Sequence, residues 1–156
     1  MYQYSYDTEL GKVYIEEDCG KIIGLNFRGI QAPKKETELI KKTYQELLEY
    51  FAGKRKNFDI PLKQSGTDFQ MRVWEALRQI PYGKTVTYKD IARRVGNEKA
   101  SRAVGIANHN NPICIIVPCH RVIGKNGSLT GYAEGLNIKA KLLELEANNS
   151  SSNRPL

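Results

Sequence analysis

Cys119, His120 and Arg121 stand next to one another directly after Pro118, at the end of an apolar run. A cysteine attacks as its thiolate, and a neighbouring imidazole or guanidinium lowers the thiol pKa from its ordinary value of about 8.5. The triplet is therefore typical of a nucleophilic cysteine. A lone cysteine is more often a small buried apolar residue, and on these residues alone that interpretation stays open.

The residues before the triplet must position it. The apolar run at residues 113–117 predicts a buried strand or extended segment. Val117 precedes a proline and is expected to be extended, while Pro118 is expected to stop or redirect the strand. Cys119 would then emerge at the end of a buried element, where its sulfur is both positioned and shielded from water.

Length and composition limit the class of protein. A chain of 156 residues forms one large or two small domains with a hydrophobic core. It has no run of eighteen apolar residues, and its first residues lack the charged and apolar regions of a signal peptide. We therefore expect a soluble, cytoplasmic protein.

The cysteines argue against disulfides and metals. Cys19, Cys114 and Cys119 are too few and too irregularly spaced for a disulfide framework. No C-x-x-C pair occurs, and Cys114, Cys119 and His120 would need a fourth ligand from elsewhere to hold zinc. We expect neither a metal site nor a cofactor.

Positive charge is concentrated in the second half of the chain. Residues 1–66 contain 11 Lys and Arg against 10 Asp and Glu, whereas residues 67–147 contain 12 against 7. This half supplies most of the net charge of +7, which favours contact with a polyanion such as nucleic acid. Many basic proteins bind no nucleic acid, so charge alone does not assign a function.

The first 62 residues predict a small α/β domain. The first residues alternate between tyrosine and polar residues, and turns at Gly11-Lys12 and Cys19-Gly20 separate two further short strands. Together they predict a three-stranded antiparallel meander. Apolar residues at helical spacing predict a helix over residues 36–51, and residues 57–66 are expected to form a linker.

The second half is predicted to be mostly helical. Thr67-x-x-Gln70 and Thr87-x-x-Asp90 have capping-box spacing and should each open a helix. A Gly96-Asn97 turn then leads into a basic helix over residues 98–108. Two short helices joined by a glycine turn predict a helix-turn-helix, although an ordinary helical hairpin packed on small residues stays possible.

The second helix of this pair has few side chains that could read bases. Ala100, Ser101, Ala103 and Gly105 are too small to reach base edges in a major groove. Small side chains allow the backbone to approach closely, which suits a narrow minor groove. Arg102 is the one long basic side chain in the middle of the helix.

An ordered set of motifs across residues 67–147 resembles the O6-alkylguanine-DNA alkyltransferases, also called methylated-DNA–protein-cysteine methyltransferases. The motifs are Phe69-Gln70-x-x-Val73-Trp74, Gly83-Lys84-x-Val86-x-Tyr88, Ser101-Arg102-Ala103-Val104-Gly105, Asn111-Pro112, Pro118-Cys119-His120-Arg121-Val122, Gly131-Tyr132-Ala133-x-Gly135 and Leu142-Leu143-x-x-Glu146. The meander and helix before them fit the small N-terminal domain of this family.

The resemblance implies a fold and a domain organisation. Residues 1–62 would form a ribonuclease H-like α/β domain, a three-stranded antiparallel sheet plus a helix. Residues 63–148 would form a mainly α-helical, winged-helix-like DNA-binding domain that contains the helix-turn-helix. The polar composition of residues 149–156 predicts a disordered tail.

The resemblance also implies DNA repair without a cofactor. Such a protein binds double-stranded DNA containing O6-alkylguanine through the minor groove, flips the damaged nucleotide out and transfers the alkyl group irreversibly to its own cysteine. Unstacking a mispaired, alkylated guanine costs less than unstacking a normal one. We expect O4-alkylthymine as a second substrate and a monomeric protein that acts once.

By their match to the motifs, four residues take part in the reaction. Cys119 is the expected alkyl acceptor, and His120 the base that deprotonates it through a water, because neighbouring side chains on extended backbone point apart. Glu146 is expected to orient His120, as in other nucleophile–base–orienter arrangements. Tyr132 is expected to donate a proton toward the departing guanine.

The resemblance assigns supporting roles to further residues. Asn111 is expected to brace the cysteine loop, and Lys139 to support the site. Arg102 would fill the vacated base stack, while Tyr88 would press on the phosphate backbone. The expected DNA contacts are Arg102, Tyr88, Ser101, Ala103, Gly105 and Arg121, with Arg93, Arg94, Lys99 and Lys125 as further phosphate contacts.

Three departures from the family pattern bear on these expectations. Glu134 stands where several relatives carry a small residue beside the pocket, so the sequence leaves the acceptance of bulky adducts open. Asn108 and His109 lie where relatives vary. The N-terminal segment lacks the Cys and His cluster that gives some members a zinc site.

Other functional classes stay open at the level of sequence. A relative that only binds alkylated guanine would have its nucleophile replaced, whereas Cys119 is present. A transcriptional helix-turn-helix regulator would make the Cys119-His120 pair incidental. A cysteine hydrolase would need an oxyanion hole, which no motif provides.

Overall fold

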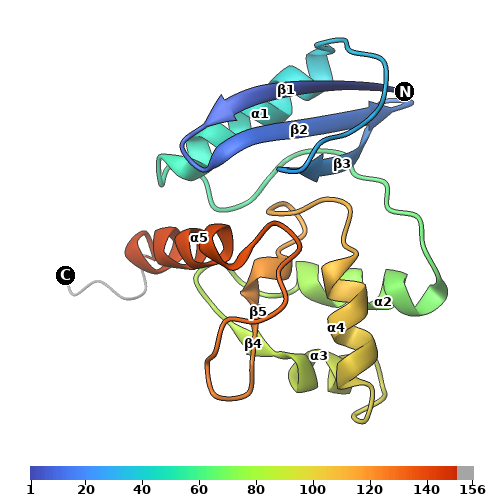
Figure 1. Ribbon diagram of the computed structural model, residues 1–156, viewed down its shortest axis with the longest axis vertical. Helices are drawn as coiled ribbons and strands as arrows, with labels where there is room; N and C mark the ends of the chain where they lie inside the picture. Colours follow the sequence, from blue (N-terminus) through green and yellow to red (C-terminus); the bar gives the residue numbers. More distant parts are fainter. Residues whose placement is uncertain (151–156) are drawn as a thin grey trace. The chain divides into compact units, whose positions relative to one another are not determined.

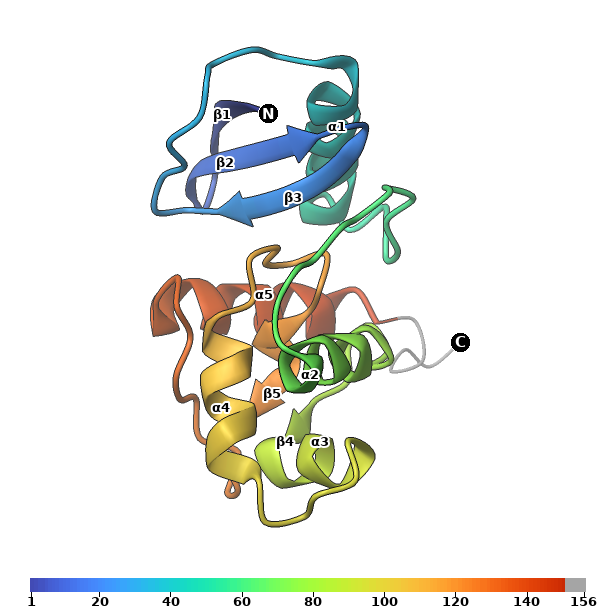
Figure 2. The same cartoon turned by 90° about the vertical axis from the view of Figure 1, so that its right-hand side faces the viewer.

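The computed structural model describes residues 1–150 and divides them into two units (Figures 1 and 2). Unit 1 comprises residues 1–64 together with the short segment 112–116. Unit 2 comprises residues 65–111 and the chain from residue 117 onward. The chain thus returns to unit 1 immediately before the Cys119 triplet.

A three-stranded antiparallel sheet forms the base of unit 1. Its strands β1 (Tyr2–Thr8), β2 (Gly11–Asp18) and β3 (Lys21–Asn26) are joined in sequence order by two hairpin turns. Cys19 lies in the second turn with a φ of 51°. The predicted meander, and the predicted place of Cys19 in a turn, are confirmed.

Helix α1 (Glu38–Phe51) packs on this sheet (Figure 2). Thr37 is its N-cap, so the helix begins slightly later than the apolar periodicity predicted. Ile40 and Leu47 of α1 are fully buried, as is Ile15 of β2. The apolar face of α1 therefore packs on the inward-facing, alternate residues of β2 and forms one small core.

The apolar run before Pro118 is mostly buried, as predicted, but it forms a turn rather than the predicted strand or extended segment. Ile113 makes an isolated parallel bridge to Leu25 of β3. The Leu25 N–H donates to the Pro112 carbonyl at 2.9 Å, and the Cys114 N–H donates to the Leu25 carbonyl at 3.0 Å. The chain then turns at Ile115, whose φ of 70° lies in the left-handed region. β-Branched residues rarely adopt that region, so pairing with β3 overrides the local preference for extended backbone.

Helices α2 (Asp68–Arg78), α3 (Tyr88–Arg94) and α4 (Ser101–His109) form the helical part of unit 2. The two predicted capping boxes are confirmed. Thr67 and Thr87 each accept a hydrogen bond from the backbone N–H three residues later, and the side chain at that position bonds back to the threonine N–H.

Trp74 connects α2 to α4. Its side chain is buried, and its indole Nε1–H donates a 2.9 Å hydrogen bond to the Ala107 carbonyl. Trp74 is therefore a core residue, on the same buried face of α2 as Val73 and Leu77.

A turn at Gly96, with a φ of 84°, joins α3 to α4 (Figure 1). α4 begins at Ser101 rather than at residue 98. The Asn97 side-chain oxygen accepts from the Lys99 N–H at 3.2 Å, and the Asn97 carbonyl accepts from the Ala100 N–H at 3.0 Å. These bonds hold the intervening residues in a turn that competes with the helix.

The remainder of unit 2 consists of short elements and one long helix. A 3-10 turn, η1 (Cys119–Arg121), leads into β5 (Val122–Ile123), which pairs in parallel with β4 (Val86–Thr87). A loop then reaches α5 (Leu136–Asn148). The predicted fold class, an α/β domain followed by a mainly helical one, is confirmed.

Asn149 and Ser150, the first residues of the predicted tail that the structure describes, make contacts within unit 2. Asn149 caps α5, and its side-chain amide donates to the Leu145 carbonyl at 2.8 Å. Ser150 is buried beside Gly83. The rest of the predicted tail, residues 151–156, lies outside the described residues. Within residues 1–150 no helix has the length and apolar character needed to cross a membrane.

Candidate active site

The predicted nucleophile lies in a tight, buried turn. Cys119, His120 and Arg121 occupy the 3-10 turn η1, and their exposed fractions are 4%, 0% and 7%. We predicted extended backbone here. A 3-10 turn has about three residues per turn, so consecutive side chains also leave it in different directions. Each member of the triplet therefore meets its own set of neighbours.

Two buried asparagines hold the backbone of this turn. The Asn111 side-chain amide donates to the Val117 carbonyl at 2.9 Å, and the Asn108 amide donates to the Cys119 carbonyl at 3.3 Å. Asn111 thus contacts the loop that it was expected to brace. Asn108 makes a comparable contact that the sequence did not indicate.

His120 and Glu146 form a buried pair. The His120 Nε2 atom lies 2.7 Å from Glu146 Oε2, and the two side chains are 0% and 1% exposed. Burial lowers the pKa of His120 below its usual value, and the charge of Arg121 lowers it further against the opposing effect of Glu146. At neutral pH we therefore treat His120 as neutral.

The Glu146 carboxylate fixes the position of the His120 proton. Burial alone would raise the pKa of Glu146, but hydrogen bonds from His120 and Arg121, together with the charge of Arg121, hold it well below its usual range. An ionised carboxylate only accepts hydrogen bonds, so the Nε2 of neutral His120 must carry the proton. His120 Nδ1 then holds a lone pair, and it has no hydrogen-bond partner among the described residues.

Arg121 does not lie where a phosphate could reach it, contrary to the predicted DNA contact. Its Nε and one terminal nitrogen donate to the two oxygens of Glu146 at 2.8 and 3.0 Å, and the other terminal nitrogen donates to the Ile80 carbonyl at 2.7 Å. The guanidinium also lies 5.7 Å from the centre of the Tyr82 ring. All three nitrogens of the planar guanidinium group therefore donate hydrogen bonds inside the protein.

Lys139 is a second buried charge on the inner face of α5. Its ammonium group donates to the Val122 carbonyl at 2.6 Å and to the Thr130 carbonyl at 2.8 Å, and its side chain is 0% exposed. Burial lowers the pKa of Lys139 to about 8. Lys139 thereby ties the loop before α5 to β5.

The Cys119 thiol is protonated at rest. Burial raises its pKa to about 11, and the charge of Glu134 adds to this effect. A hydrogen bond from Asn111 and the positive charge of Lys139 act in the opposite direction. Cys119 therefore needs a base before it can attack.

The loop between β5 and α5 carries Tyr132, which is buried with an exposed fraction of 7%. The Tyr88 hydroxyl donates to the Thr130 carbonyl at 3.1 Å and accepts from the Thr130 hydroxyl at 3.2 Å. The Thr130 carbonyl thus receives both Tyr88 and Lys139. Sequence reasoning missed Thr130, because no motif marks this contact.

Four of the predicted DNA contacts lie on α4. Arg102 and Ala103 are exposed, and Ser101 and Gly105 are partly exposed. A Cβ at Gly105 would lie 3.9 Å from the Tyr88 ring, so this position brings α4 close to Tyr88. The predicted contacts on α4 and Tyr88 of α3 therefore lie close together in unit 2.

Ile106 is a residue of α4 that sequence reasoning passed over. Its exposed fraction is 58%, and single exposed apolar side chains are common on protein surfaces. The signal that could have found it is a single large apolar residue among the small ones of this helix.

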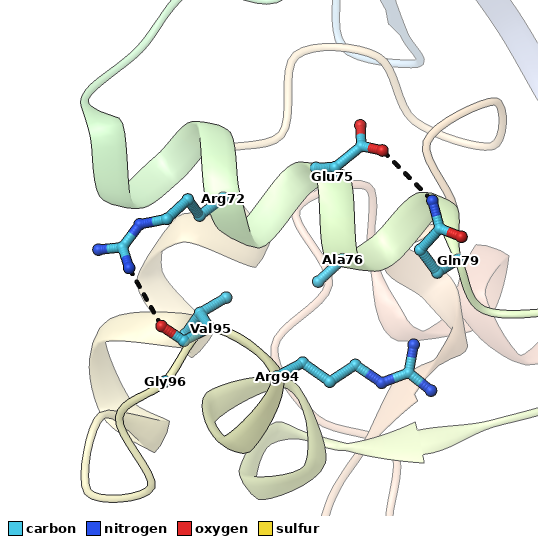
Figure 3. Close-up of a pocket in the computed structure, with 7 residues that line it drawn as sticks. All are labelled: Arg72, Glu75, Ala76, Gln79, Arg94, Val95 and Gly96. Carbon is cyan, nitrogen blue, oxygen red and sulfur yellow. Dashed lines mark hydrogen bonds between the residues drawn. The ribbon is translucent and has the colours of Figure 1, made fainter.

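A separate groove lies between α2 and the end of α3 (Figure 3). It encloses about 660 Å³, and its lining includes Arg72, Ala76, Arg94 and Val95. Arg72 donates to the Val95 carbonyl at 3.1 Å across it. The lining contains none of the predicted catalytic residues, so we place the candidate active site at η1 instead.

We predict that Cys119 reacts slowly with thiol reagents in the folded protein. Iodoacetamide at pH 7.5 should label exposed Cys19 first and Cys119 at least about tenfold more slowly, because each unit of raised pKa lowers the thiolate fraction about tenfold. Peptide mass mapping over time measures both rates. In guanidinium chloride the two rates should converge, and equal rates in the native protein would contradict the buried thiol.

Both halves of the chain match models of one protein family. Residues 1–64 match the ribonuclease-like domain of 6-O-methylguanine DNA methyltransferase. Residues 68–148 match the DNA binding domain of 6-O-methylguanine DNA methyltransferase. The family resemblance expected from the motifs is therefore confirmed over most of the chain.

Full-length relatives and a solved structure agree. The methylated-DNA–protein-cysteine methyltransferase of Methanosarcina barkeri is 56% identical over 96% of this chain and 99% of its own length. The constitutive enzyme of that name from Bacillus subtilis is 47% identical over 93% and 94%. The crystal structure of Mycobacterium tuberculosis OGT in complex with DNA matches with a TM-score of 0.90 at 41% identity, covering 96% of this chain and 94% of that one. This chain therefore belongs to the 6-O-methylguanine DNA methyltransferase family.

Proposed function

We propose that this protein repairs double-stranded DNA by transferring the alkyl group of O6-alkylguanine to its own Cys119. Family membership supports DNA repair by alkyl transfer in general. The observation that carries the residue assignment is the buried pair of His120 with Glu146. His120 follows Cys119 directly in the chain, and its pairing leaves one imidazole nitrogen without a hydrogen-bond partner among the described residues.

His120 is the proposed base. Its Nδ1 lone pair accepts the Cys119 proton through a water, while Nε2–H stays bonded to Glu146. Because the thiol pKa is about 11 and His120 is buried and neutral, little thiolate exists before substrate arrives. Proton transfer therefore accompanies attack, as in general base catalysis.

The transfer step is a displacement at carbon. The Cys119 sulfur forms a bond to the alkyl carbon, the bond between that carbon and O6 breaks, and its electron pair stays on the guanine. A proton from the Tyr132 hydroxyl neutralises the guanine, and the proton held by His120 restores the tyrosine. The product thioether has no easy leaving group, so each molecule acts once.

Two features of the site support this step. The Lys139 ammonium favours negative charge on the Cys119 sulfur and lowers its pKa against the effect of burial. Asn111 holds the backbone just before the cysteine. Lys139 and Asn111 therefore both favour the thiolate form of Cys119.

DNA docking is proposed to use α3 and α4 as a helix-turn-helix. The small residues of α4 allow it to approach a minor groove, and its exposed Arg102 would fill the stack when the damaged nucleotide is flipped out. The Tyr88 hydroxyl would exchange its contact with Thr130 for a backbone phosphate. Arg93, Arg94, Lys99 and Lys125 are all exposed and are proposed phosphate contacts.

Further parts of the proposal concern range and assembly. We extend it to O4-alkylthymine, which presents the same alkoxy chemistry at a base edge, and to a monomer as the acting species. A regulator of transcription would have no use for a buried nucleophile beside a buried His–Glu pair.

The direct test is the mass of the protein after reaction. Incubation with a duplex that contains one O6-methylguanine should add one methyl group per protein molecule, located on Cys119 by peptide mapping, and no second turnover should follow. Cys119→Ser should abolish the gain and bind the duplex within a few-fold of the wild-type dissociation constant. Several turnovers per molecule, or methyl on another residue, would disprove the proposal.

A second prediction tests base flipping. Arg102→Ala should slow repair of the duplex at least about tenfold, because filling the stack offsets an unstacking cost of a few kcal/mol. Reaction with the free alkylated base should stay within about twofold. Arg78→Ala, which removes an exposed arginine from α2, is the matched control. Equal slowing on both substrates would place Arg102 in the pocket or in folding instead.

A further inference from the structure

Arg121 occupies the centre of a buried network in unit 2. Its exposed fraction is 7%, and all three guanidinium nitrogens donate hydrogen bonds within the protein. Two of these bonds reach the two oxygens of Glu146 in a fork-to-fork pair, which is the strong geometry for arginine and carboxylate. This side chain is therefore committed to the protein interior and not to a ligand at the surface.

Glu146 receives donors from three residues in two separate parts of the chain. Its Oε1 accepts from Arg121 and from the Gly83 N–H at 3.2 Å, and its Oε2 accepts from Arg121 and His120. A carboxylate offers about four lone-pair directions, and these four contacts account for them. The carboxylate is thus held in one orientation, with one position for the imidazole.

We propose that Arg121 is a positioning residue for alkyl transfer: it acts through Glu146 to keep His120 in the tautomer that carries its proton on Nε2. The proposal rests on the function proposed above for Cys119 and His120. Arg121 touches neither substrate nor sulfur in this role.

The reason lies in the two protonation states of Glu146. As a carboxylate it accepts from His120 Nε2–H and leaves the Nδ1 lone pair available. Without Arg121, burial favours the neutral carboxylic acid. A carboxylic acid keeps its proton and donates a hydrogen bond to Nε2, so the neutral imidazole carries its one proton on Nδ1 and has no lone pair there to act as a base. A wrong histidine tautomer strongly slows an enzyme that uses histidine as its base, even when the geometry of the site is intact.

A purely structural role for Arg121 is the alternative to exclude. Its bond to the Ile80 carbonyl and its contact with Tyr82 also anchor the turn after α2. Loss of that anchor would lower thermal stability without changing the tautomer of a folded protein. A readout of the imidazole itself separates the two roles.

The chain suits such a readout, because it has two histidines. His109 is exposed at the end of α4, whereas His120 is fully buried. Long-range 15N–1H spectra distinguish Nε2–H from Nδ1–H tautomers, and His109→Gln leaves one ring to observe. The wild-type background should give an Nε2–H tautomer for His120 at pH 7.

Arg121→Met tests the loss of charge, and Arg121→Lys keeps the charge but loses the fork. In Arg121→Met the Nε2–H signal of His120 should give way to an Nδ1–H signal. Alkyl transfer from the free alkylated base should slow about tenfold to a hundredfold, the usual loss when a residue that orients a functional side chain is removed. Arg121→Lys should fall between Arg121→Met and wild type. Arg78→Met removes an exposed arginine instead and should match wild type in both measurements.

Three results would overturn the proposal. One is a wild-type His120 that is protonated or carries its proton on Nδ1 at pH 7, which needs no variant. Another is a folded Arg121→Met that keeps both the tautomer and the free-base rate within about twofold of wild type. The third is a change in duplex affinity alone, measured in the Cys119→Ser background. If the tautomer shifts as expected but wild-type Cys119 gains no alkyl group, the proposed function fails, and only the control of the His120 tautomer by Arg121 stands.

Discussion

The buried carboxylate of Glu146 is the constraint on which the site depends. A charge at 1% exposure is stable only if its lone pairs are satisfied, and here donors come from the turn after α2 and from η1. The pKa of Glu146 is depressed, so its contribution to stability is present above about pH 4.3 and is lost as the pH falls below it. The fold of unit 2 and the chemistry of His120 therefore rest on the same ionised group.

Burial sets the resting state of the other groups. It raises the thiol pKa of Cys119 and lowers the pKa of His120 and Lys139, so each titratable group is pushed toward its neutral form. Only Glu146 is held strongly in its charged form, by hydrogen bonds and by Arg121. The site at rest is thus a neutral nucleophile beside a neutral base, and the base is oriented by the Glu146 carboxylate in its ion pair with Arg121.

Local sequence patterns predicted the helices and strands. The features that the sequence did not predict depend on contacts between residues that are far apart in the chain. The capping boxes at Thr67 and Thr87 and the stripe that buries Trp74 are set by spacing along the chain. The turn at Ile115 depends on pairing with β3, and the inward direction of Arg121 depends on Glu146 25 residues away. Neither could be read from neighbouring residues, so a basic side chain next to the nucleophile was assigned to DNA. The contact of Asn108 with the Cys119 carbonyl was missed for the same reason.

The pH dependence of the wild-type reaction with free alkylated guanine base tests the account most directly. If neutral His120 takes the thiol proton, the rate should be level between about pH 6.5 and about pH 8 and should fall at lower pH as His120 becomes protonated. The level region follows because the pKa of His120 lies below its usual value, while Lys139 loses its charge only above about pH 8. A rate that rises about tenfold per pH unit across this range would mean that only preformed thiolate reacts, and would contradict His120 as the base.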